Sequence, residues 1–422
     1  MKKNSIIFTA LCIFALSGCN KKETSTFSGK FGEPTEAIIT LSSPVTRGPS
    51  GTEAGTAEEN DIKSLEFYIF DDTGNGLDPA VGTGNGYFKI DNPTGLRHKI
   101  KLSAGVDKKI VVVSNINLGA PDATMNTYDK LVEKLSSDEF KAALGGNDHN
   151  SRDIPVTGLE MSGFATTATV IANKTDNVIS ITISRLVSKI EAPVFDVNAP
   201  VALSQAQIEE VWGASTVLDP ATDTTFTFKA YAVINGVTKS TVCFTGRADG
   251  NYKDPMTLPW NTWVGIRTYL NSSFNGSGDY ENNYSGKQSG EWFLDGTNTE
   301  NGHRVYVYEN KPTDDTYNSI EGYTPESVYA YIIKGELTAT LDGKGVVTET
   351  RYWRVNLIAS DTYHIMRNCV YKVAINKITT PGYATPQEAE ENEPIVPKPN
   401  ETAADFTITV ADWDINSYTT QM

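Results

Sequence analysis

Short segments in which apolar and polar residues alternate recur along most of the chain, and this period of two is typical of β-strands with one buried face. The clearest are residues 36–47, 65–70, 98–102, 109–116, 167–172, 178–187, 225–234, 238–245, 304–308, 328–341, 351–358 and 369–378. Within them Ile110–Val113 is apolar without interruption, which indicates a strand buried on both faces. Thr124–Leu144 has helical spacing instead. We therefore predict an all-β protein with one short helical segment in its first half.

Polar and proline-rich stretches divide this pattern into parts. A chain of roughly 400 residues exceeds the usual size of one domain, and Pro193–Pro200 interrupts the strand pattern near its middle. We therefore expect two all-β domains, at residues 48–192 and 193–403. Residues 48–60 and 380–403 are low in apolar side chains, and we expect both to be exposed linkers.

The chain ends in a further alternating segment, residues 404–422. Phe406, Ile408 and Val410 share one face of the predicted strand, and Trp413 and Ile415 continue one residue out of phase. Such a shift predicts a β-bulge or a second short strand.

The first residues have the layout of a secretory signal. Two lysines precede an apolar run from Ile6 to Leu16, and Ser17-Gly18-Cys19 follows it. This run is too short to span a bilayer, and no later segment is apolar for 18 residues. Leu16–Cys19 also resembles the lipobox of bacterial lipoproteins, which predicts a signal peptide over residues 1–18, a lipid on Cys19 and attachment to the outer membrane through that lipid.

The charge of the chain narrows the choice of partners. Removal of residues 1–18 leaves 34 basic and 52 acidic side chains, a formal charge of −18. Such a field repels nucleic acid and anionic lipid head groups. Only Cys243 and Cys369 then remain as thiols, and either a disulfide or a buried free thiol fits the sequence.

Catalytic and metal-binding patterns are weak. Asp71–Gly76 superficially matches the start of a calcium loop, but its third position is Thr and its twelfth is Gly82, so a hairpin turn is favoured. The histidines, at positions 98, 149, 303 and 364, lack zinc-ligand spacing. No nucleophile elbow, phosphate loop or HExxH motif occurs. We therefore predict neither an enzyme nor a cofactor.

Three features are consistent with assembly by strand exchange. Arg47 is the first arginine of the chain, stands after a short apolar strand and is followed by Gly48 in a predicted linker. Cleavage there would free the strand at residues 36–47 and leave a groove of unpaired backbone groups over exposed core. The tail of a neighbouring molecule could fill that groove by β-strand addition. Burial of its five apolar residues would contribute on the order of 10 kcal/mol before entropic costs.

The order of several short motifs resembles the fimbrillin family, the FimA/Mfa-type pilus subunits of Bacteroidetes. The motifs are the lipobox, Thr46–Gly48, Leu65–Asp71, Val111–Asn115, Ile154–Gly158, Ser184–Lys189, Arg367-Asn368 and Trp413. The resemblance implies two transthyretin-like β-sandwich domains, a lipidated propeptide at residues 19–47 and cleavage between Arg47 and Gly48 by an arginine-specific protease. It also implies a donor strand within residues 404–422, related pilin subunits as partners, and a pilus that supports adhesion and biofilm formation.

A second function remains open from the sequence. The segment Asn271–His303 is rich in Asn, Gly and Ser and carries Phe274, Tyr280, Tyr284 and Trp292, whose rings could stack on sugars. A monomeric glycan-binding lipoprotein that keeps its lipid is therefore the alternative. Whether a pilus subunit would be a stalk, tip or anchor subunit is also left open.

Overall fold

The structure is a computed structural model, and it describes more than half of the chain. The described residues are 31–42, 52–136, 150–151, 154, 156–195, 201–218, 224–234, 237–239, 242, 269–270, 304–308, 329–357, 365, 367–392 and 404–414; for 404–414 only the backbone is described. Within these ranges no helix has the length and apolar character needed to cross a bilayer.

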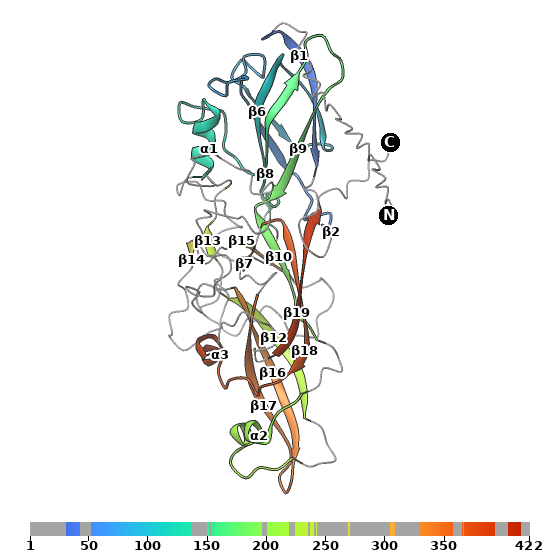
Figure 1. Ribbon diagram of the computed structural model, residues 1–422, viewed down its shortest axis with the longest axis vertical. Helices are drawn as coiled ribbons and strands as arrows, with labels where there is room; N and C mark the ends of the chain where they lie inside the picture. The colour runs from blue at the N-terminus through green and yellow to red at the C-terminus, as the bar shows by residue number, and fades with distance from the viewer. Residues whose placement is uncertain are drawn as a thin grey trace, which may run out of the picture.

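The first half folds into a β-sandwich that is drawn in blue to green in Figure 1. Its seven strands are, in order across the sheet, β4 (Tyr87–Asp91), β3 (Ser64–Ile69), β6 (Gly105–Ser114), β8 (Met161–Val170), β9 (Asn177–Arg185), β1 (Pro34–Ser42) and β5 (Arg97–Ser103). β8 and β9 pair only over Met161–Gly163 and Ile183–Arg185, so the sheet folds over at this corner. β4-β3-β6-β8 and β9-β1-β5 therefore form the two layers.

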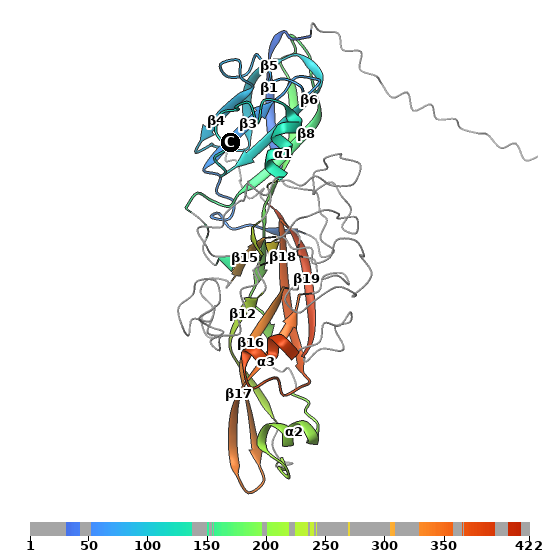
Figure 2. The same ribbon diagram turned by 90° about the vertical axis from the view of Figure 1, so that its left-hand side faces the viewer.

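Alternate side chains of both layers enclose one apolar core. β6 contributes to two cores, because Ile110 and Val112 belong to this one while Val111 and Val113 point to the other side. On that other side they pack against helix α1 (Tyr128–Ser136), which Figure 2 shows beside β6 and β8. The expectation of a strand buried on both faces is thus met, and α1 lies within the predicted helical segment.

The second half is also built of strands. The larger sheet has the order β2 (Thr52–Ala54), β19 (Ala404–Asp414), β18 (Cys369–Ile378), β10 (Val187–Glu191), β15 (Arg304–Tyr308) and β7 (Asn150–Ser151), with β11 (Val194–Phe195) pairing beside β18. A smaller sheet contains β12 (Thr225–Ile234), β16 (Ala330–Leu341) and β17 (Gly345–Asn356), and a two-stranded ribbon contains β13 (Val237–Lys239) and β14 (Tyr269–Leu270). Cys369 is buried among these strands, and Cys243 lies outside the described residues.

The two halves follow one another along the long axis of the molecule. The first sandwich occupies one end, and the β16–β17 hairpin and helix α2 (Gln205–Trp212) occupy the other (Figure 1). The chain passes from β9 of the first sandwich to β10 of the second sheet at Leu186, before the expected boundary at residue 193. β2 and β7, which precede that boundary, also pair in the second sheet. The all-β class is confirmed, whereas a transthyretin-like topology for each half stays a prediction.

Residues 380–392 differ from the expected linker. The carbonyl oxygens of Pro381 and Gly382 accept hydrogen bonds from Arg351, that of Thr380 accepts one from Trp353, and helix α3 (Pro386–Asn392) follows. Because backbone groups make these contacts, the polar composition of the segment did not indicate them. Residues 393–403 lie outside the described ranges.

Asn115 ties three loops together at the end of β6. Its Oδ1 accepts hydrogen bonds from the backbone N–H groups of Lys63 and Ser64, and its Nδ2 donates to the carbonyl oxygens of Asp61 and Leu159. Its own φ is +59°, a left-handed conformation that asparagine tolerates better than most residues. This explains why Val111–Asn115 and Ile154–Gly158 occur together in the sequence, since Gly158 packs against the same amide.

We expect Asn115→Ala to lower the free energy of unfolding by roughly 2–4 kcal/mol, because it leaves several buried backbone groups without partners. Asn92→Ala is the matched control, since Asn92 also has a positive φ of 48° but an exposed side chain. It should cost about 1 kcal/mol. Chemical denaturation measures both values, and equal losses would show that the hydrogen bonds of Asn115 contribute little.

Candidate functional site

β1 lies in the middle of its layer and is held on both sides. It pairs in parallel with β9 from Ala37↔Asn177 to Ser42↔Thr182, and antiparallel with β5 from Pro34↔Ser103 to Thr40↔Arg97. Asn177 also donates a 3.1 Å hydrogen bond to the carbonyl oxygen of Glu36. β5 is the end strand of this sheet, and β1 is its only described partner strand. Loss of β1 would therefore leave unpaired N–H and C=O groups on β5 and make β9 an edge strand.

The inward side chains of β1 form part of the first core. Ala37, Ile39 and Leu41 are each at most 2% exposed. Burial of a side chain such as Ile or Leu contributes about 1.5–3 kcal/mol. Removal of β1 would therefore uncover a strip of apolar core between β5 and β9.

The outward face of this layer carries charge. Glu36 of β1 forms an ion pair of 2.6 Å with Lys99 of β5, and both side chains are more than half exposed. Arg97 and Lys101 precede and follow Lys99 on the same face, so the outer side of β5 is basic. The basic outer face of β5 therefore favours an acidic side chain on the strand that occupies the position of β1.

The C-terminal strand β19 lies near the edge of the second sheet. It pairs antiparallel with β18 from Ala404↔Ile378 to Asp412↔Cys369. On its other side the only described partner is β2, at Asp412–Asp414. Among the predicted donor residues, the backbone positions of Phe406, Ile408, Val410 and Trp413 lie in this strand, and Ile415 lies outside the described residues.

Cys19, Arg47 and Gly48 also lie outside the described residues. β1 ends at Ser42 and β2 begins at Thr52, so the predicted cleavage bond is in the connection between the first core and the second sheet. The predicted site residues are thus distributed over both halves, with β1 and β19 as the strands that would exchange.

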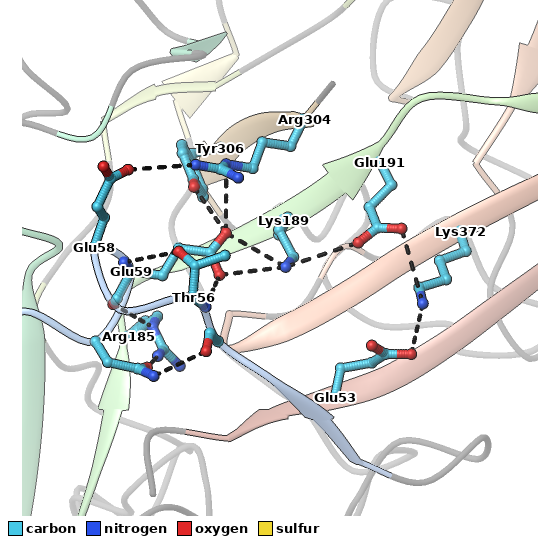
Figure 3. A network of polar contacts seen from close by, with 12 residues as sticks. Glu53, Thr56, Glu58, Glu59, Arg185, Lys189, Glu191, Arg304, Tyr306 and Lys372 are labelled. Atoms are coloured by element: carbon cyan, nitrogen blue, oxygen red, sulfur yellow. Dashed lines mark hydrogen bonds and ion pairs between the residues drawn. The ribbon is translucent and has the colours of Figure 1, made fainter. Parts of the chain in front are cut away.

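Residues 52–60 are not the exposed linker that their composition suggests. Glu59 is fully buried at the junction of the halves, where its carboxylate accepts hydrogen bonds from the Thr56 N–H (2.7 Å) and the Tyr306 hydroxyl (2.9 Å). The same carboxylate lies 3.3 Å from Lys189 Nζ and 3.4 Å from Arg304 Nε. Figure 3 shows these side chains converging from β10, β15 and the segment after β2.

A second set of contacts surrounds Arg185, which is also buried. Its guanidinium donates to the carbonyl oxygen of Glu59 and to the side chains of Asn60 and Asn368. Asn368 Oδ1 additionally accepts from the Arg185 N–H at 3.0 Å. The motifs Ser184–Lys189 and Arg367-Asn368, distant in sequence, therefore meet at this junction.

A chain of ion pairs continues from the junction toward β19. Lys189 lies 3.7 Å from Glu191, Lys372 lies 3.8 Å from Glu191, and Lys372 donates a 2.6 Å hydrogen bond to Glu53 of β2 (Figure 3). The hydrogen bond to Glu53 and the charges of Glu191 and Glu53 raise the pKa of Lys372, although burial acts against them. β2 is thereby fixed beside the strand pair β18–β19.

Burial by itself would raise the pKa of the Glu59 carboxyl. Lys189, the Thr56 N–H, Tyr306 and Arg304 together outweigh that effect and hold its pKa below the usual 4.5. Burial and the neighbouring Glu59 also raise the pKa of Tyr306. Glu59 is therefore ionised in the folded protein near neutral pH.

Sequence reasoning missed Glu59, although one signal was present. Thr56-x-x-Glu59 is a capping-box pattern, and the structure contains both of its hydrogen bonds. This pattern fixes the turn that carries Glu59 into the junction. Nothing in the local sequence indicates that Lys189, Arg304 and Tyr306 would surround it.

The other candidate sites have structural uses. Asp71 Oδ1 accepts hydrogen bonds from the N–H and hydroxyl of Thr73, inside a turn closed by the bridge between Phe70 and Leu77. His98 packs edge-on against Phe67, and its burial lowers its pKa. Among the described residues, no cluster of His, Cys, Asp and Glu could hold a metal ion. Asn271–His303, the predicted sugar-binding loop, lies outside them.

Comparison with known families gives two matches. The family model of the major fimbrial subunit protein FimA matches residues 39–205. That of the C-terminal region of fimbrillin, the major fimbrial subunit protein type IV, matches residues 354–419. Together the two matches span more than half of the chain. No curated protein matches the chain significantly.

Several solved structures resemble the chain over most of its length. A fimbrilin of Porphyromonas gingivalis W83 is 17% identical, with 89% of this chain and 98% of that chain covered and a TM-score of 0.44. A protein of Parabacteroides distasonis ATCC 8503, provisionally assigned to cell adhesion, is 18% identical, with 90% and 100% covered and a TM-score of 0.48. The tip fimbrial protein Mfa3 of Porphyromonas gingivalis is 10% identical, with 90% and 100% covered and a TM-score of 0.40.

The buried Glu59 predicts a defined pH effect on stability. Near neutral pH we expect Glu59→Gln to cost about 3–5 kcal/mol, because Lys189 loses its buried partner. Since the folded pKa of Glu59 lies below the unfolded value of 4.5, its contribution is present above pH 4.5 and is lost as the pH falls through the folded pKa. The difference between wild type and variant should therefore shrink below about pH 4.5.

Denaturation at a series of pH values measures this difference. Glu58→Gln is the control, since Glu58 is 81% exposed and 3.9 Å from Arg304, and it should change little at any pH. A Glu59→Gln difference that stays constant down to pH 3 would rule out a lowered pKa for Glu59.

Proposed function

The chain belongs to the fimbrillin family of fimbrial subunits, and we propose that it assembles into a pilus by donor-strand exchange triggered by proteolysis. In this proposal Cys19 carries the lipid of an outer-membrane precursor, and an arginine-specific protease cuts between Arg47 and Gly48. The strand β1 then leaves, and residues 404–422 of another subunit take its place. The pilus would serve in adhesion and biofilm formation.

The observation that carries this proposal is the position of β1. It precedes the predicted cleavage bond, yet it is the central strand of its layer and supplies part of the core. An N-terminal segment so placed is needed for the fold, but a cut in the connection to β2 would leave it attached through main-chain hydrogen bonds and apolar contacts alone. A competing strand can then replace it by making the same hydrogen bonds to β5 and β9.

The position of β19 supports the donor role. Over Ala404–Ala411 its described partner is β18 alone, so few main-chain interactions hold its outer edge. The segment that would connect β19 to the body is at most residues 393–403, because residues 380–392 are packed. Such a segment can extend over about 35 Å at roughly 3.3 Å per residue, which is enough for the strand to leave its own sheet.

The first prediction of this proposal concerns the cleavage site. Brief treatment of the purified protein with an arginine-specific protease should yield Gly48 as the new N-terminus and convert monomers to filaments, read by mass spectrometry and electron microscopy. Arg47→Ala should stay monomeric, because its groove remains filled. Arg97→Lys removes the next arginine of the chain but keeps the positive charge on β5, and it should assemble as wild type does. Filaments formed by Arg47→Ala would place the trigger elsewhere.

The second prediction concerns the tail. Deletion of residues 405–422 should leave a folded, cleavable protein that cannot elongate, because the strand that is lost lies near the edge of the second sheet. Circular dichroism and size-exclusion chromatography check the fold, and light scattering after cleavage checks elongation. Growth of filaments from this truncated protein would remove the tail from the mechanism.

A further inference from the structure

The side chains of β1 vary in size along the groove in a way that specifies how a replacement strand must lie. Its inward residues are, in order, Thr35, Ala37, Ile39 and Leu41, so the groove narrows toward the start of β1 and widens toward its end. A strand that places a large residue at the Thr35 or Ala37 position would overpack the core and lose affinity several-fold or more.

The sequence that leads into β19 likewise runs from small to large residues, although Phe406 is larger than Ile39, whose place it takes. Thr402, Ala404, Phe406 and Ile408 alternate with Ala403, Asp405, Thr407 and Thr409. Aligned with residues 35–42, this segment matches Thr35 with Thr402, Ala37 with Ala404, Thr40 with Thr407 and Leu41 with Ile408. The reverse direction would bring Ile408 and Phe406 into the narrow part of the groove.

Charge favours the same alignment. This alignment places Asp405 at the position of Ile38, whose direct partner on β5 is Lys99. Lys99 is the residue that loses its ion pair when Glu36 departs with β1. A carboxylate opposite Lys99, between Arg97 and Lys101, would restore that pair on the same basic face.

We propose that residues 404–409 of a second copy of this chain occupy the groove in the direction of β1, with Ala404, Phe406 and Ile408 in the places of Ala37, Ile39 and Leu41. Asp405 then lies opposite Lys99 and sets the register. The inference rests on the proposed strand exchange and goes beyond it, because it specifies the direction and register of the donor strand. It also names Lys99 as the groove residue that binds the donor's Asp405.

Disulfide trapping between copies distinguishes this register from its neighbours. Side chains directly opposite each other in an antiparallel pair have Cβ atoms about 4.5–5.5 Å apart, whereas diagonal positions are about 7–8 Å apart. Only the first separation is compatible with a disulfide. Lys99→Cys should therefore couple with Asp405→Cys of a neighbouring molecule and only weakly with Thr407→Cys.

The experiment uses the chain from residue 20 onward, which lacks Cys19 and the signal. Protein with Lys99→Cys is mixed with protein carrying Asp405→Cys or Thr407→Cys, cleaved at Arg47, allowed to assemble and then oxidised. Non-reducing electrophoresis should show dimers for the 99–405 pair that depend on cleavage. Protein without introduced cysteines is the control for Cys243 and Cys369.

A charge exchange gives an independent measurement. Lys99→Glu should slow assembly about two- to fivefold, as expected for one cross-strand ion pair, and Asp405→Lys in the same chain should restore the rate. Lys89→Glu, on β4 away from the groove, should leave the rate unchanged.

The outcomes separate the register from the proposed function. Filaments in which Lys99→Cys couples with Thr407→Cys instead of Asp405→Cys would shift the register by two residues and overturn the inference. Filaments in which neither pair couples would show that neither residue lies opposite Lys99, and this would also overturn the inference. Failure of all cleaved proteins to assemble, including the one without introduced cysteines, would contradict strand exchange itself.

Discussion

The central constraint on this molecule is that its first sandwich needs a strand between β5 and β9. Without β1, two lines of backbone N–H and C=O groups would face water and the core around Ile39 and Leu41 would be uncovered. Both conditions are costly, so a vacant groove is a strong acceptor for any strand of the right pattern. The scaffold is therefore suited to attachment between chains.

The junction between the halves supplies the rigidity that such an assembly requires. Buried ions are expensive unless each is paired, and the buried Glu59, Lys189 and Arg185 are all held by partners from both halves. The partly exposed Arg304 adds a further contact to Glu59. The loop after β2 is thereby fixed to β10 and β15. A chain cut before β2 consequently keeps its new N-terminal region bound to the body, and the scaffold that receives a new strand is already formed.

Much of the fold could be predicted because its strands alternate. The run Ile110–Val113 indicated a strand between two cores because apolar residues fill both of its faces. Strands at sheet edges were harder to recognise. The first half of β17 is largely exposed and lacks apolar alternation. β4 has only Phe88 and Ile90 on its inner face, which is too short a pattern to stand out. β2 is three residues long, which is too short for any period.

The candidate site was predictable only in part. Lys2, Lys3 and Cys19 indicate export, and Phe406, Ile408 and Val410 indicate a strand, since each signal lies within a few consecutive residues. Glu59 is in a polar segment whose composition predicts exposure to solvent. The residues that surround its carboxylate, Lys189 and Tyr306, lie more than a hundred positions away in the sequence. The order of side-chain sizes along β1 could not be interpreted from the sequence, because the shape of the groove depends on the neighbouring strands β5 and β9.

The most direct test of the account is the structure of an assembled filament at a resolution that identifies side chains. Electron cryo-microscopy should show the groove between β5 and β9 filled by the C-terminal strand of the adjacent subunit, with residues 34–47 absent. A filament in which each groove still holds its own β1, or in which β19 remains paired with its own β18, would contradict the account.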